Sequence, residues 1–355
     1  MRTLFITGGC GFIGSHFVRA ALGLGTFDAV NLDKLTYAGD TARLTDVGGH
    51  PSYRFVHGDV VDRALLDRLF EEKKPWAVVN FAAESHVDRS ILDPAPFLRA
   101  NLIGTQILLD AARRHEAQRF VQISTDEVYG DAAGKESFRE DGPLTPSSPY
   151  AASKASADLL ALAYGRTYGL PVLIVRSSNN YGPFQFPEKL VPLTIRNAMV
   201  GAELPLYGDG LQRRDWLHVE DNCRAILAIL ERGRPGSIYN VGAGEARTNL
   251  ATVRALCGIL AEEAGLELKA LHERVRFVAD RPGHDRRYAV NTEKIRRELA
   301  WRPRIFLSEG LRRTVRWYLN HRDWLNRIDS PEYRSYCEAV YVRNWERPGR
   351  QCESQ

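Results

Sequence analysis

The chain has 355 residues, of which 44% are hydrophobic and 26% charged, and its net charge is +4. This composition is ordinary for a globular protein, and the length is enough for one large domain or two smaller ones. The charge is too small for this length to indicate nucleic-acid binding, although it suits an anionic ligand.

The cysteines and the apolar runs exclude further classes of protein. The five cysteines form no Cys-x-x-Cys pair and stand at Cys10, Cys223, Cys257, Cys337 and Cys352. We therefore expect reduced thiols, with no disulfide framework and no zinc or other metal site. No signal peptide precedes the first strand pattern, and no apolar run reaches the ~20 residues that cross a bilayer. The sequence thus predicts a cytoplasmic protein without membrane association.

The first elements have the pattern of a dinucleotide-binding unit. An apolar run at 3–7 predicts a buried strand, and a glycine-rich loop at 8–14 leads into a helical pattern. Gly8 would allow a tight turn, Gly11 would let backbone amides approach a pyrophosphate, and Gly14 would let helix and sheet pack closely. A glycine-rich loop can also be a plain tight turn, but its place between strand and helix favours a cofactor site.

The second predicted strand, 29–33, ends in an acid. Asp33 follows the last glycine of the loop by about 20 residues, the spacing of an acid that binds the ribose hydroxyls of a dinucleotide. Such an acid repels a 2′-phosphate and therefore favours NAD over NADP. Lys34 weakens this discrimination, and an ordinary aspartate at a strand end is the alternative.

Strands and helices alternate over the first half of the chain. The predicted strands stand at 54–59, 77–81, 120–124 and 171–176, and helical patterns separate them at 62–73, 96–115 and 150–169. This alternation predicts an α/β fold with a Rossmann-type doubly wound parallel sheet. His86, in the loop after the fourth strand, is more typical of a loop or packing histidine than of a catalyst.

The pattern changes near residue 179, where a turn signal and several prolines interrupt it. We expect a strand at 215–219, followed by a helix to about Arg232, to return to the main sheet. The predicted organisation is an NAD-binding domain at 1–178 with a returning segment near 214–240, and a smaller C-terminal α/β substrate-binding domain at 179–355.

A tyrosine and a lysine begin the helix near residue 150. Tyr150 and Lys154 are four residues apart, so they lie on one face of that helix, one turn apart. An ammonium close to a phenol lowers the pKa of the phenol. A tyrosine tuned in this way can take a proton from a sugar or alcohol hydroxyl.

Three further polar residues, Thr125, Asp126 and Glu127, follow the fifth strand directly. In an open parallel sheet the ligand crevice lies at this end of the strands. If one carboxylate acts as a base and the other as an acid, their environments must differ, and mutual repulsion raises one pKa. Which carboxylate that is remains open, and a polar strand end pairing with arginines is the alternative interpretation.

Two stretches are rich in groups that hold phosphate, at 212–215 and 280–287. Arginine forks suit diphosphate oxygens, and solvated charged loops are the alternative. The tail from Asn320 is polar, with interleaved Tyr and Trp, and is interpreted as a helix and an irregular end packed on the surface.

Eight motifs over about residues 1–320 resemble the extended short-chain dehydrogenase/reductase family, and within it the dTDP-glucose 4,6-dehydratases. They are GGCGFIGS (8–15), DKLTYAGD (33–40), AAESHVDRS (82–90), STDEVYG (124–130), YAASKA (150–155), NNYGPFQFPEKL (179–190), RRDWLHVED (213–221) and DRPGHDRRYA (280–289). The Thr-Asp-Glu at 125–127 is the specific signal. Similar 4-epimerases have no acidic pair there, and GDP-mannose dehydratases and nucleotide-sugar decarboxylases typically have Ser-Glu without the aspartate.

The resemblance implies a role for each of the five polar residues. Tyr150, assisted by Lys154, would remove the proton from the hydroxyl on sugar carbon 4 while hydride passes to NAD, and Thr125 would hold the same oxygen. Glu127 would take the proton of carbon 5, and Asp126 would protonate the hydroxyl leaving carbon 6. Hydride would then return to carbon 6. The product from dTDP-glucose would be dTDP-4-keto-6-deoxyglucose, with no net NADH.

The resemblance also implies two sets of binding residues. Contacts with NAD are expected at Gly8, Gly11, Phe12, Ile13, Gly14, Asp33, Lys34, Leu35, Thr36, Asp59, Val60, Phe81, Ala82, Ala83, Ser85, Ala100, Tyr150, Lys154 and Asn180. Contacts with the nucleotide sugar are expected at Ser85, Thr125, Asn179, Lys189, Leu190, Pro205, Leu206, Tyr207, Arg214, Asn249, Asp280, Arg281 and His284.

Assembly and substrate are less specific. By analogy with the family we expect a homodimer, with the helices near 96–115 and 150–169 as candidates for its interface. UDP-glucose is an alternative substrate, and a nucleotide-sugar epimerase or decarboxylase is an alternative enzyme. A non-catalytic NAD-binding protein of this fold is a third reading, which loss of Tyr150 or Lys154 would have favoured.

Overall fold

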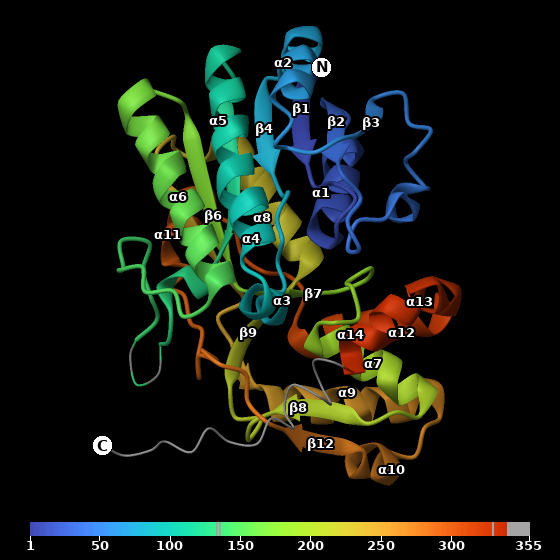
Figure 1. The fold of residues 1–355 in the computed structure, drawn as a ribbon. Coiled ribbons are helices and arrows are strands. Elements are labelled where there is room, and N and C mark those ends of the chain that lie inside the picture. The colour runs from blue at the N-terminus through green and yellow to red at the C-terminus, as the bar shows by residue number, and fades with distance from the viewer. Residues whose placement is uncertain (133, 135, 329, 339–355) are drawn as a thin grey trace. The chain divides into compact units, whose positions relative to one another are not determined.

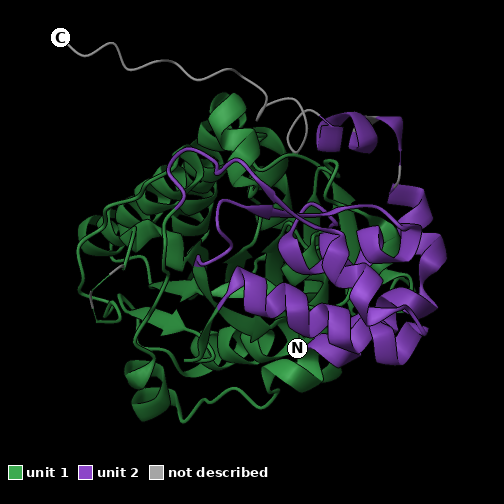
Figure 2. Ribbon diagram, turned by 90° about the horizontal axis from the view of Figure 1, so that it is seen from below, with its two compact units in different colours: residues 1–185, 213–247, 285–310 green, residues 186–212, 248–284, 311–355 purple. Residues whose placement is uncertain are grey.

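The computed structural model describes residues 1–132, 134, 136–328 and 330–338. The chain forms two compact units (Figure 2): unit 1 comprises 1–185, 213–247 and 285–310, and unit 2 comprises 186–212, 248–284 and 311–355. The sequence analysis placed a boundary at 178 and one returning segment near 214–240. The structure also returns 285–310 to unit 1, a segment whose pattern lacks the strand–helix alternation on which that analysis relied.

The core of unit 1 is a seven-stranded sheet (Figure 1), and the six strand pairings in it are parallel. In chain order its strands are β1 (Arg2–Thr7), β2 (Phe27–Asp33), β3 (Tyr53–His57), β4 (Ala77–Asn80), β5 (Arg119–Thr125), β6 (Val172–Ser177) and β10 (Ile238–Val241). Their spatial order is β10-β6-β5-β4-β1-β2-β3, so the winding reverses between β1 and β4. Ligands of such sheets bind outside the carboxyl ends of the strands at that reversal. The predicted Rossmann-type fold is confirmed.

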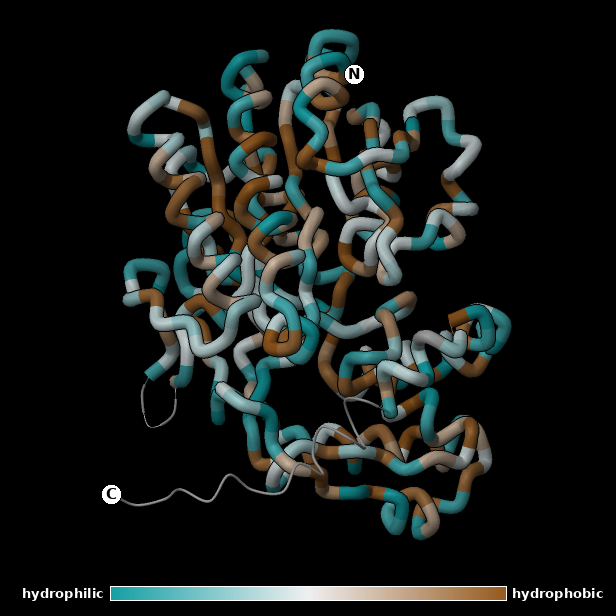
Figure 3. Tube along the Cα trace, viewed as in Figure 1, coloured by the Kyte–Doolittle hydropathy of each residue, from teal (hydrophilic) through white to brown (hydrophobic). Residues whose placement is uncertain are grey.

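Helices cover both faces of the sheet. Helices α1 (Phe12–Gly23), α8 (Val219–Arg232) and α11 (Glu293–Leu299) contribute to one hydrophobic cluster, and α2 (Arg63–Lys73), α5 (Thr105–Arg114) and α6 (Pro149–Tyr168) contribute to another. Figure 3 shows the strands between them as largely hydrophobic segments. Asp62 caps α2 as predicted, since its side chain accepts a hydrogen bond from the Leu65 backbone N–H at 3.0 Å.

The predicted return of 215–219 to the main sheet is wrong. That segment is part of β9 (Arg213–His218), which lies in a separate three-stranded sheet of order β11-β9-β7, with β7 at Asn179–Tyr181 and β11 at Ala246–Thr248. The place beside β6 is taken by β10, which pairs in parallel with β6. A parallel neighbour needs a crossover helix, and α8 precedes β10, so the strand after that helix joins the sheet.

The predicted helix at 96–115 is a run of three helical segments. They are α4 (Ala95–Phe97), the π-helical η2 (Leu98–Gly104) and α5. A π-helical turn inside a helix is rare and often marks a functional site. The remaining short elements of unit 1 are η1 (Thr41–Leu44), α3 (Val87–Leu92) and η3 (Asp126–Tyr129).

Unit 2 is built on a two-stranded parallel sheet, β8 (Leu204–Tyr207) and β12 (Val275–Val278). Its helices are α7 (Leu190–Val200), α9 (Asn249–Ala264), α10 (Leu268–Glu273), most of α12 (Leu307–Asn320), α13 (Arg322–Ile328) and α14 (Pro331–Glu338). The predicted irregular end of the tail falls on 339–355, outside the described residues. Among the helices that are described, none has the length and hydropathy to span a bilayer.

Candidate active site

The glycine-rich loop after β1 packs closely against neighbouring backbone. Gly8 has φ +68°, and a Cβ there would lie 2.7 Å from the backbone nitrogen of Ala82, so only glycine fits without strain. A Cβ on Gly14 would lie 2.3 Å from the Gly8 carbonyl oxygen. Gly11 is the N-cap of α1 and supplies no side-chain cap. The N-terminal amides of α1, which include those of Phe12 and Ile13, therefore fit a dinucleotide pyrophosphate.

Asp33 lies at the carboxyl end of β2, beside this loop. Its Oδ2 accepts a hydrogen bond from the Cys10 backbone N–H and its Oδ1 one from the Leu35 backbone N–H, both at 2.9 Å. Burial raises the pKa of Asp33, and these two hydrogen bonds oppose that rise. Leu35 has φ +55°, a strained backbone for a leucine, as is common where a chain turns around a ligand.

The structure brings the other expected dinucleotide contacts to the same end of the sheet. Lys34 Nζ lies 3.7 Å from Asp59 Oδ2, and this ion pair places the lysine charge beside the loop that follows β3. The remaining expected contacts follow strand ends or line the helical run after β4: Thr36, Val60, Phe81, Ala82, Ala83, Ser85 and Ala100. His86 is buried and is the N-cap of α3, as expected for a packing histidine.

Asn101 holds the loop after β4 and was missed by the sequence analysis. Its Oδ1 accepts a hydrogen bond from the Glu84 N–H at 2.9 Å, and its Nδ2 donates to the Glu84 carbonyl at 3.0 Å and to Ser153 Oγ at 2.8 Å. Asn101 thereby connects that loop to α6. No sequence signal marks it, because an asparagine inside a helical pattern usually faces solvent.

Arg43 is a second residue that the sequence analysis missed. Its side chain is buried, and its Nη1 donates hydrogen bonds to the carbonyls of Cys10 at 2.8 Å and Ala38 at 2.6 Å. Its Nε donates to the Phe184 carbonyl at 3.2 Å. A buried guanidinium requires such partners. Arg43 therefore joins the glycine-rich loop to the segment that follows Asn180, an expected neighbour of the nicotinamide.

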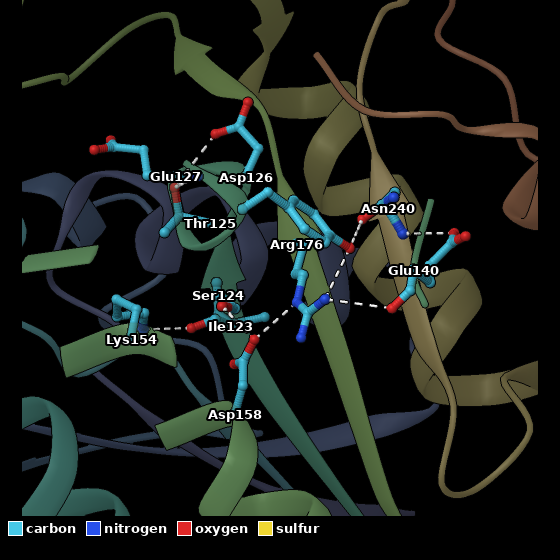
Figure 4. Close-up of polar contacts among 11 residues, drawn as sticks. Ile123, Ser124, Thr125, Asp126, Glu127, Glu140, Lys154, Asp158, Arg176 and Asn240 are labelled. Atoms are coloured by element: carbon cyan, nitrogen blue, oxygen red, sulfur yellow. Dashed lines mark hydrogen bonds and ion pairs between the residues drawn. The ribbon is translucent and has the colours of Figure 1, made fainter. Parts of the chain in front are cut away.

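The three acidic-turn residues stand where β5 ends. Thr125 is its last residue, and η3 begins with Asp126 and Glu127 (Figure 4). Thr125 Oγ1 accepts a hydrogen bond from the Glu127 N–H at 3.3 Å and donates one to Asp126 Oδ1 at 3.4 Å. Tyr288 Oη donates to Glu127 Oε2 at 3.4 Å. The turn thus presents both carboxyl groups at one strand end.

Helix α6 brings the phenol to this turn. Its N-cap Ser148 accepts a hydrogen bond from the Ala151 N–H, and the Tyr150 ring lies edge-on to Phe97 with centroids 6.3 Å apart. The Tyr150 hydroxyl lies close enough to the Thr125 side chain and the Glu127 carboxylate for both to act on its pKa. Phenol, hydroxyl and acid pair therefore converge on one place.

The expected lowering of the Tyr150 pKa is contradicted. Burial, followed by the Glu127 carboxylate, raises the pKa of Tyr150 above its usual range. Lys154 Nζ donates to the Ile123 carbonyl at 2.5 Å, and burial lowers the pKa of Lys154 to about 8. The spacing correctly placed Tyr150 and Lys154 on one helix face. It could not reveal that the Lys154 ammonium donates its hydrogen bond to the carbonyl of Ile123 on β5.

The acid pair is asymmetric. Burial raises the pKa of Asp126 well above its usual range, and the carboxylates of Glu127 and Asp215 raise it further. Asp126 Oδ2 has no hydrogen-bond partner within the part of the chain that the structure describes. Arg214 opposes the rise only in part. Burial and the two neighbouring carboxylates therefore raise the pKa of Asp126 and favour its protonated form.

Two further expected substrate residues of unit 1, Asn179 and Arg214, lie on β7 and β9, and Asn180, an expected cofactor residue, follows Asn179. Arg214 is buried, donates Nη2 to the Asp285 carbonyl at 2.9 Å and lies over the Tyr288 ring at 4.1 Å. Asn179 Oδ1 is buried and has no hydrogen-bond partner among the described residues. Asn180 Nδ2 donates to the Ser178 carbonyl at 2.9 Å. A buried amide oxygen without a partner suits a ligand that donates a hydrogen bond.

The expected substrate residues of unit 2 lie in the loop after β12, on β8 and at the starts of α7 and α9. In that loop, Asp280 Oδ2 accepts a hydrogen bond from Gln212 Nε2 at 2.9 Å and Oδ1 lies 2.5 Å from His284 Nδ1. The Tyr207 ring stands edge-on to His284. The other residues stand on β8, at the starts of α7 and α9 and in the same loop: Pro205, Leu206, Lys189, Leu190, Asn249 and Arg281. Unit 2 thus contains most of the stretch predicted to hold phosphate, 280–284, and has polar residues at the N-termini of α7 and α9.

Comparisons with known proteins agree with this geometry. The family model of GDP-mannose 4,6 dehydratase matches residues 5–314. The chain is 49% identical to dTDP-glucose 4,6-dehydratase of Neisseria meningitidis, over 94% of this chain and 98% of that protein. It is 46% identical to dTDP-glucose 4,6-dehydratase 1 of Escherichia coli, over 95% of this chain and 98% of that protein.

Solved structures give the same picture. The crystal structure of DesIV, a dTDP-glucose 4,6-dehydratase from Streptomyces venezuelae with NAD and TYD bound, has a TM-score of 0.86 and 49% identity, covering 92% of this chain and 100% of that one. UDP-glucose 4-epimerase from Thermotoga maritima has a TM-score of 0.81 but only 28% identity, covering 90% of this chain and 99% of that one.

Proposed function

Because the chain belongs to the GDP-mannose 4,6-dehydratase family, we propose that it is a dTDP-glucose 4,6-dehydratase with NAD as its cofactor. The reaction converts dTDP-glucose to dTDP-4-keto-6-deoxyglucose and water. The observation that carries the proposal is that the Tyr150 hydroxyl lies at a turn with two adjacent carboxyl groups, the buried Asp126, whose pKa is raised by burial, and Glu127. An alcohol oxidation alone needs no acid pair, whereas removal of water needs a base and an acid.

The first step is the deprotonation of the hydroxyl on sugar carbon 4. Tyr150 Oη takes that proton, and Thr125 Oγ1 holds the same oxygen. Bound NAD supplies the hydride acceptor and donor and, in its oxidised form, a positive charge that favours the Tyr150 phenolate. Burial works against the phenolate. In this proposal the ammonium of Lys154, one turn away on α6, favours it.

The second step removes water across carbons 5 and 6. The ketone at carbon 4 acidifies the proton of carbon 5, which Glu127 takes. The carbon 6–oxygen bond breaks, and the oxygen leaves as water with the proton from Asp126. The buried setting of Asp126 keeps that proton in place until the leaving group needs it. After hydride reaches carbon 6, Glu127 returns its proton to carbon 5.

Each unit has its own residues that are expected to contact the nucleotide sugar. In unit 1 they are Ser85, Asn179 and Arg214, of which the buried guanidinium of Arg214 suits diphosphate oxygens. In unit 2 they are Lys189, Leu190, Pro205, Leu206, Tyr207, Asn249, Asp280, Arg281 and His284. The 49% identity to dTDP-glucose enzymes, against 28% to a UDP-glucose epimerase, supports the thymidine nucleotide.

Incubation of the purified protein with dTDP-glucose tests the activity. Mass spectrometry should detect a product lighter by one water, with no net NADH. UDP-glucose in a parallel reaction tests the alternative substrate and should be converted more slowly. Unchanged dTDP-glucose beside converted UDP-glucose would assign the other nucleotide, and two unchanged substrates would overturn the dehydratase.

A homodimer and a cytoplasmic location complete the proposal. Exposed apolar side chains stand on the helical run through η2 and on α6: Leu98, Ile103, Leu159 and Tyr168. An apolar patch on packed helices supports a second copy as its cover. Leu159→Glu should shift the mass in sedimentation from dimer to monomer, whereas Leu268→Glu in unit 2 should not. A reducing compartment agrees with the buried free thiols of Cys10, Cys223 and Cys257.

A further inference from the structure

A buried ion pair, Asp158–Arg176, lies near the acid turn, as we call Thr125 and η3, which carry Asp126 and Glu127. Neither member of the pair is among the expected site residues. Asp158, one turn after Lys154 on α6, accepts a hydrogen bond at Oδ2 from Arg176 Nε at 2.9 Å and another from Ser124 Oγ at 2.9 Å (Figure 4). Asp158 and Arg176 are both buried, with side-chain exposures of 0% and 2%. The pair therefore joins α6 to β5 and β6 directly behind Thr125.

The same arginine also reaches the far end of the acid turn. Arg176 Nη1 donates to Tyr129 Oη at 2.8 Å, and Tyr129 is the last residue of η3, which begins with Asp126. Tyr129 Oη donates onward to Asn240 Oδ1 at 2.8 Å on β10. One continuous polar path thus runs from the helix of Tyr150 to the turn that carries the acid pair.

Stability alone does not account for this pair. Taking two charges out of water offsets most of their attraction, and apolar residues of the same volume often stabilise a core as well or better. The place of the pair is more informative than its presence. Asp158 is four residues from Lys154, and Asp158 Oδ1 has no hydrogen-bond partner within the described residues, so part of its charge is left to act on its neighbours.

Lys154 is the neighbour on which Asp158 acts. Burial lowers the pKa of Lys154 to about 8, and the Asp158 carboxylate is the opposing charge that raises it. Other charged groups stand on elements packed against α6, but none of them has a resolved effect on Lys154: Asp88, Arg89, Arg99, Asp110, Arg113, Arg114, Arg119, Asp126, Glu127 and Arg176. Asp158 is therefore the charged group that favours the ammonium of Lys154, and the Ile123 carbonyl accepts a hydrogen bond from it.

We propose that Asp158 and Arg176 are positioning residues of the dehydratase: Asp158 holds Lys154 in its charged form, and Arg176 holds the acid turn in register with the Tyr150 helix through Tyr129. This inference rests on the proposed function. The two residues affect different steps. Asp158, through Lys154, affects the oxidation at carbon 4, and Arg176, through Tyr129, affects the elimination that follows. Neither residue contacts the substrate or the cofactor in this proposal.

The pH dependence of cofactor reduction in a single turnover tests the part of Asp158. The oxidation needs charged Lys154, so its rate falls on the alkaline side as that lysine loses its proton. Removing the Asp158 charge lowers the pKa of Lys154, and the alkaline limb should move to lower pH by about one unit. Asp158→Glu keeps the charge and should retain the limb of the wild type.

A second variant guards against simple misfolding. Asp158→Asn alone leaves the Arg176 charge buried without a counter-ion and is expected to be destabilised. Asp158→Asn with Arg176→Gln replaces the pair by two neutral amides of similar size, so it should fold and bind NAD while still showing the shifted limb. A double variant that folds and keeps the wild-type limb would overturn the part assigned to Asp158.

Tyr129→Phe tests the part of Arg176 without touching Asp158. It deletes the hydroxyl that links Arg176 to η3 and to Asn240. Elimination should slow by about 10-fold while oxidation changes less than twofold, so reduced cofactor accumulates in the first turnover. Equal slowing of oxidation and elimination would overturn the proposal that Arg176 positions the acid turn through Tyr129.

The wild type separates this inference from the function on which it rests. If the wild type converts dTDP-glucose and the variants behave as wild type, only the positioning role fails. If the wild type leaves dTDP-glucose and UDP-glucose unchanged, both proposals fail.

Discussion

The glycine-rich loop after β1 and the acid turn after β5 both follow buried parallel strands, but they are held in different ways. The shape of the loop depends on backbone geometry, since Gly8 adopts a left-handed conformation and Gly14 packs against the Gly8 carbonyl, and side chains such as Asp33 and Arg43 bind only its backbone groups. The turn is held by side chains, through Thr125 and through the buried Arg176–Tyr129 contact. A loop that only binds can rely on shape, whereas a turn that moves protons needs partners that shift pKa values.

Tyr150→Phe should have the largest effect on catalysis. Removing the phenol hydroxyl should slow the oxidation at carbon 4 by about 10³-fold, because the proposed base for the hydroxyl on carbon 4 is then absent. NAD binding should persist, since the ring still packs on Phe97. Single-turnover reduction of bound NAD measures the rate. Tyr164→Phe on the same helix is the matched control and should stay within threefold; equal losses in both variants would refute the assignment.

Asp126→Asn should separate the two steps of catalysis. Elimination should fall by about 10²-fold because the leaving hydroxyl loses its proton donor, while oxidation changes only a few-fold. Reduced cofactor should then accumulate during the first turnover, as stopped-flow absorbance can measure. Equal slowing of oxidation and elimination would argue against Asp126 as the acid.

The same variant should change stability in a pH-dependent way. Burial raises the folded-state pKa of Asp126, so the unfolded state ionises first and the wild type loses stability as pH rises above about 4 toward the folded-state pKa. An asparagine does not ionise. Asp126→Asn should therefore be more stable than the wild type at pH 8, by about 1 kcal/mol, with the difference disappearing near pH 4. Denaturant unfolding at both pH values checks the sign.

Gly8→Ala should weaken NAD binding through a steric clash in the glycine-rich loop. The new Cβ would lie 2.7 Å from Ala82 N in a left-handed backbone conformation, so we expect about 10-fold weaker NAD binding and ~2 kcal/mol lower stability. Gly25→Ala is the matched control, with φ +65° but no atom within 4 Å of its Cβ. It should lose only stability, by ~1 kcal/mol. Calorimetric titration with NAD distinguishes the two variants.

Arg43→Met should have the smallest effect. It removes the donors to three backbone carbonyls, at Cys10, Ala38 and Phe184, and loosens the contact between the glycine-rich loop and the segment after β7. Dissociation of NAD should be about 5-fold faster, with turnover of the loaded enzyme changed less than twofold. Exposed Arg54→Met is the control and should leave NAD dissociation unchanged. Unaltered retention in Arg43→Met would show that the loop needs no such connection.

The sequence by itself determined the local units. Apolar runs and their spacing located each of the first six strands of the main sheet, Asp62 signalled a helix cap, and the spacing of Tyr150 and Lys154 placed both on one helix face. These features follow from backbone periodicity over a few residues, which sequence alone records. The same signals led to one error of topology, since β9 carries a strand pattern but lies in a different sheet from the one expected.

Only the tertiary structure decided how the chemistry is tuned. The raised pKa of Asp126, the contact of the Lys154 ammonium with the Ile123 carbonyl and the burial that opposes the Tyr150 phenolate all depend on groups far apart in the chain. Arg43 and Arg176 carry no signal of their own in the sequence. Burial and long-range partners set pKa values and positions, and neither exists until the strands and helices pack.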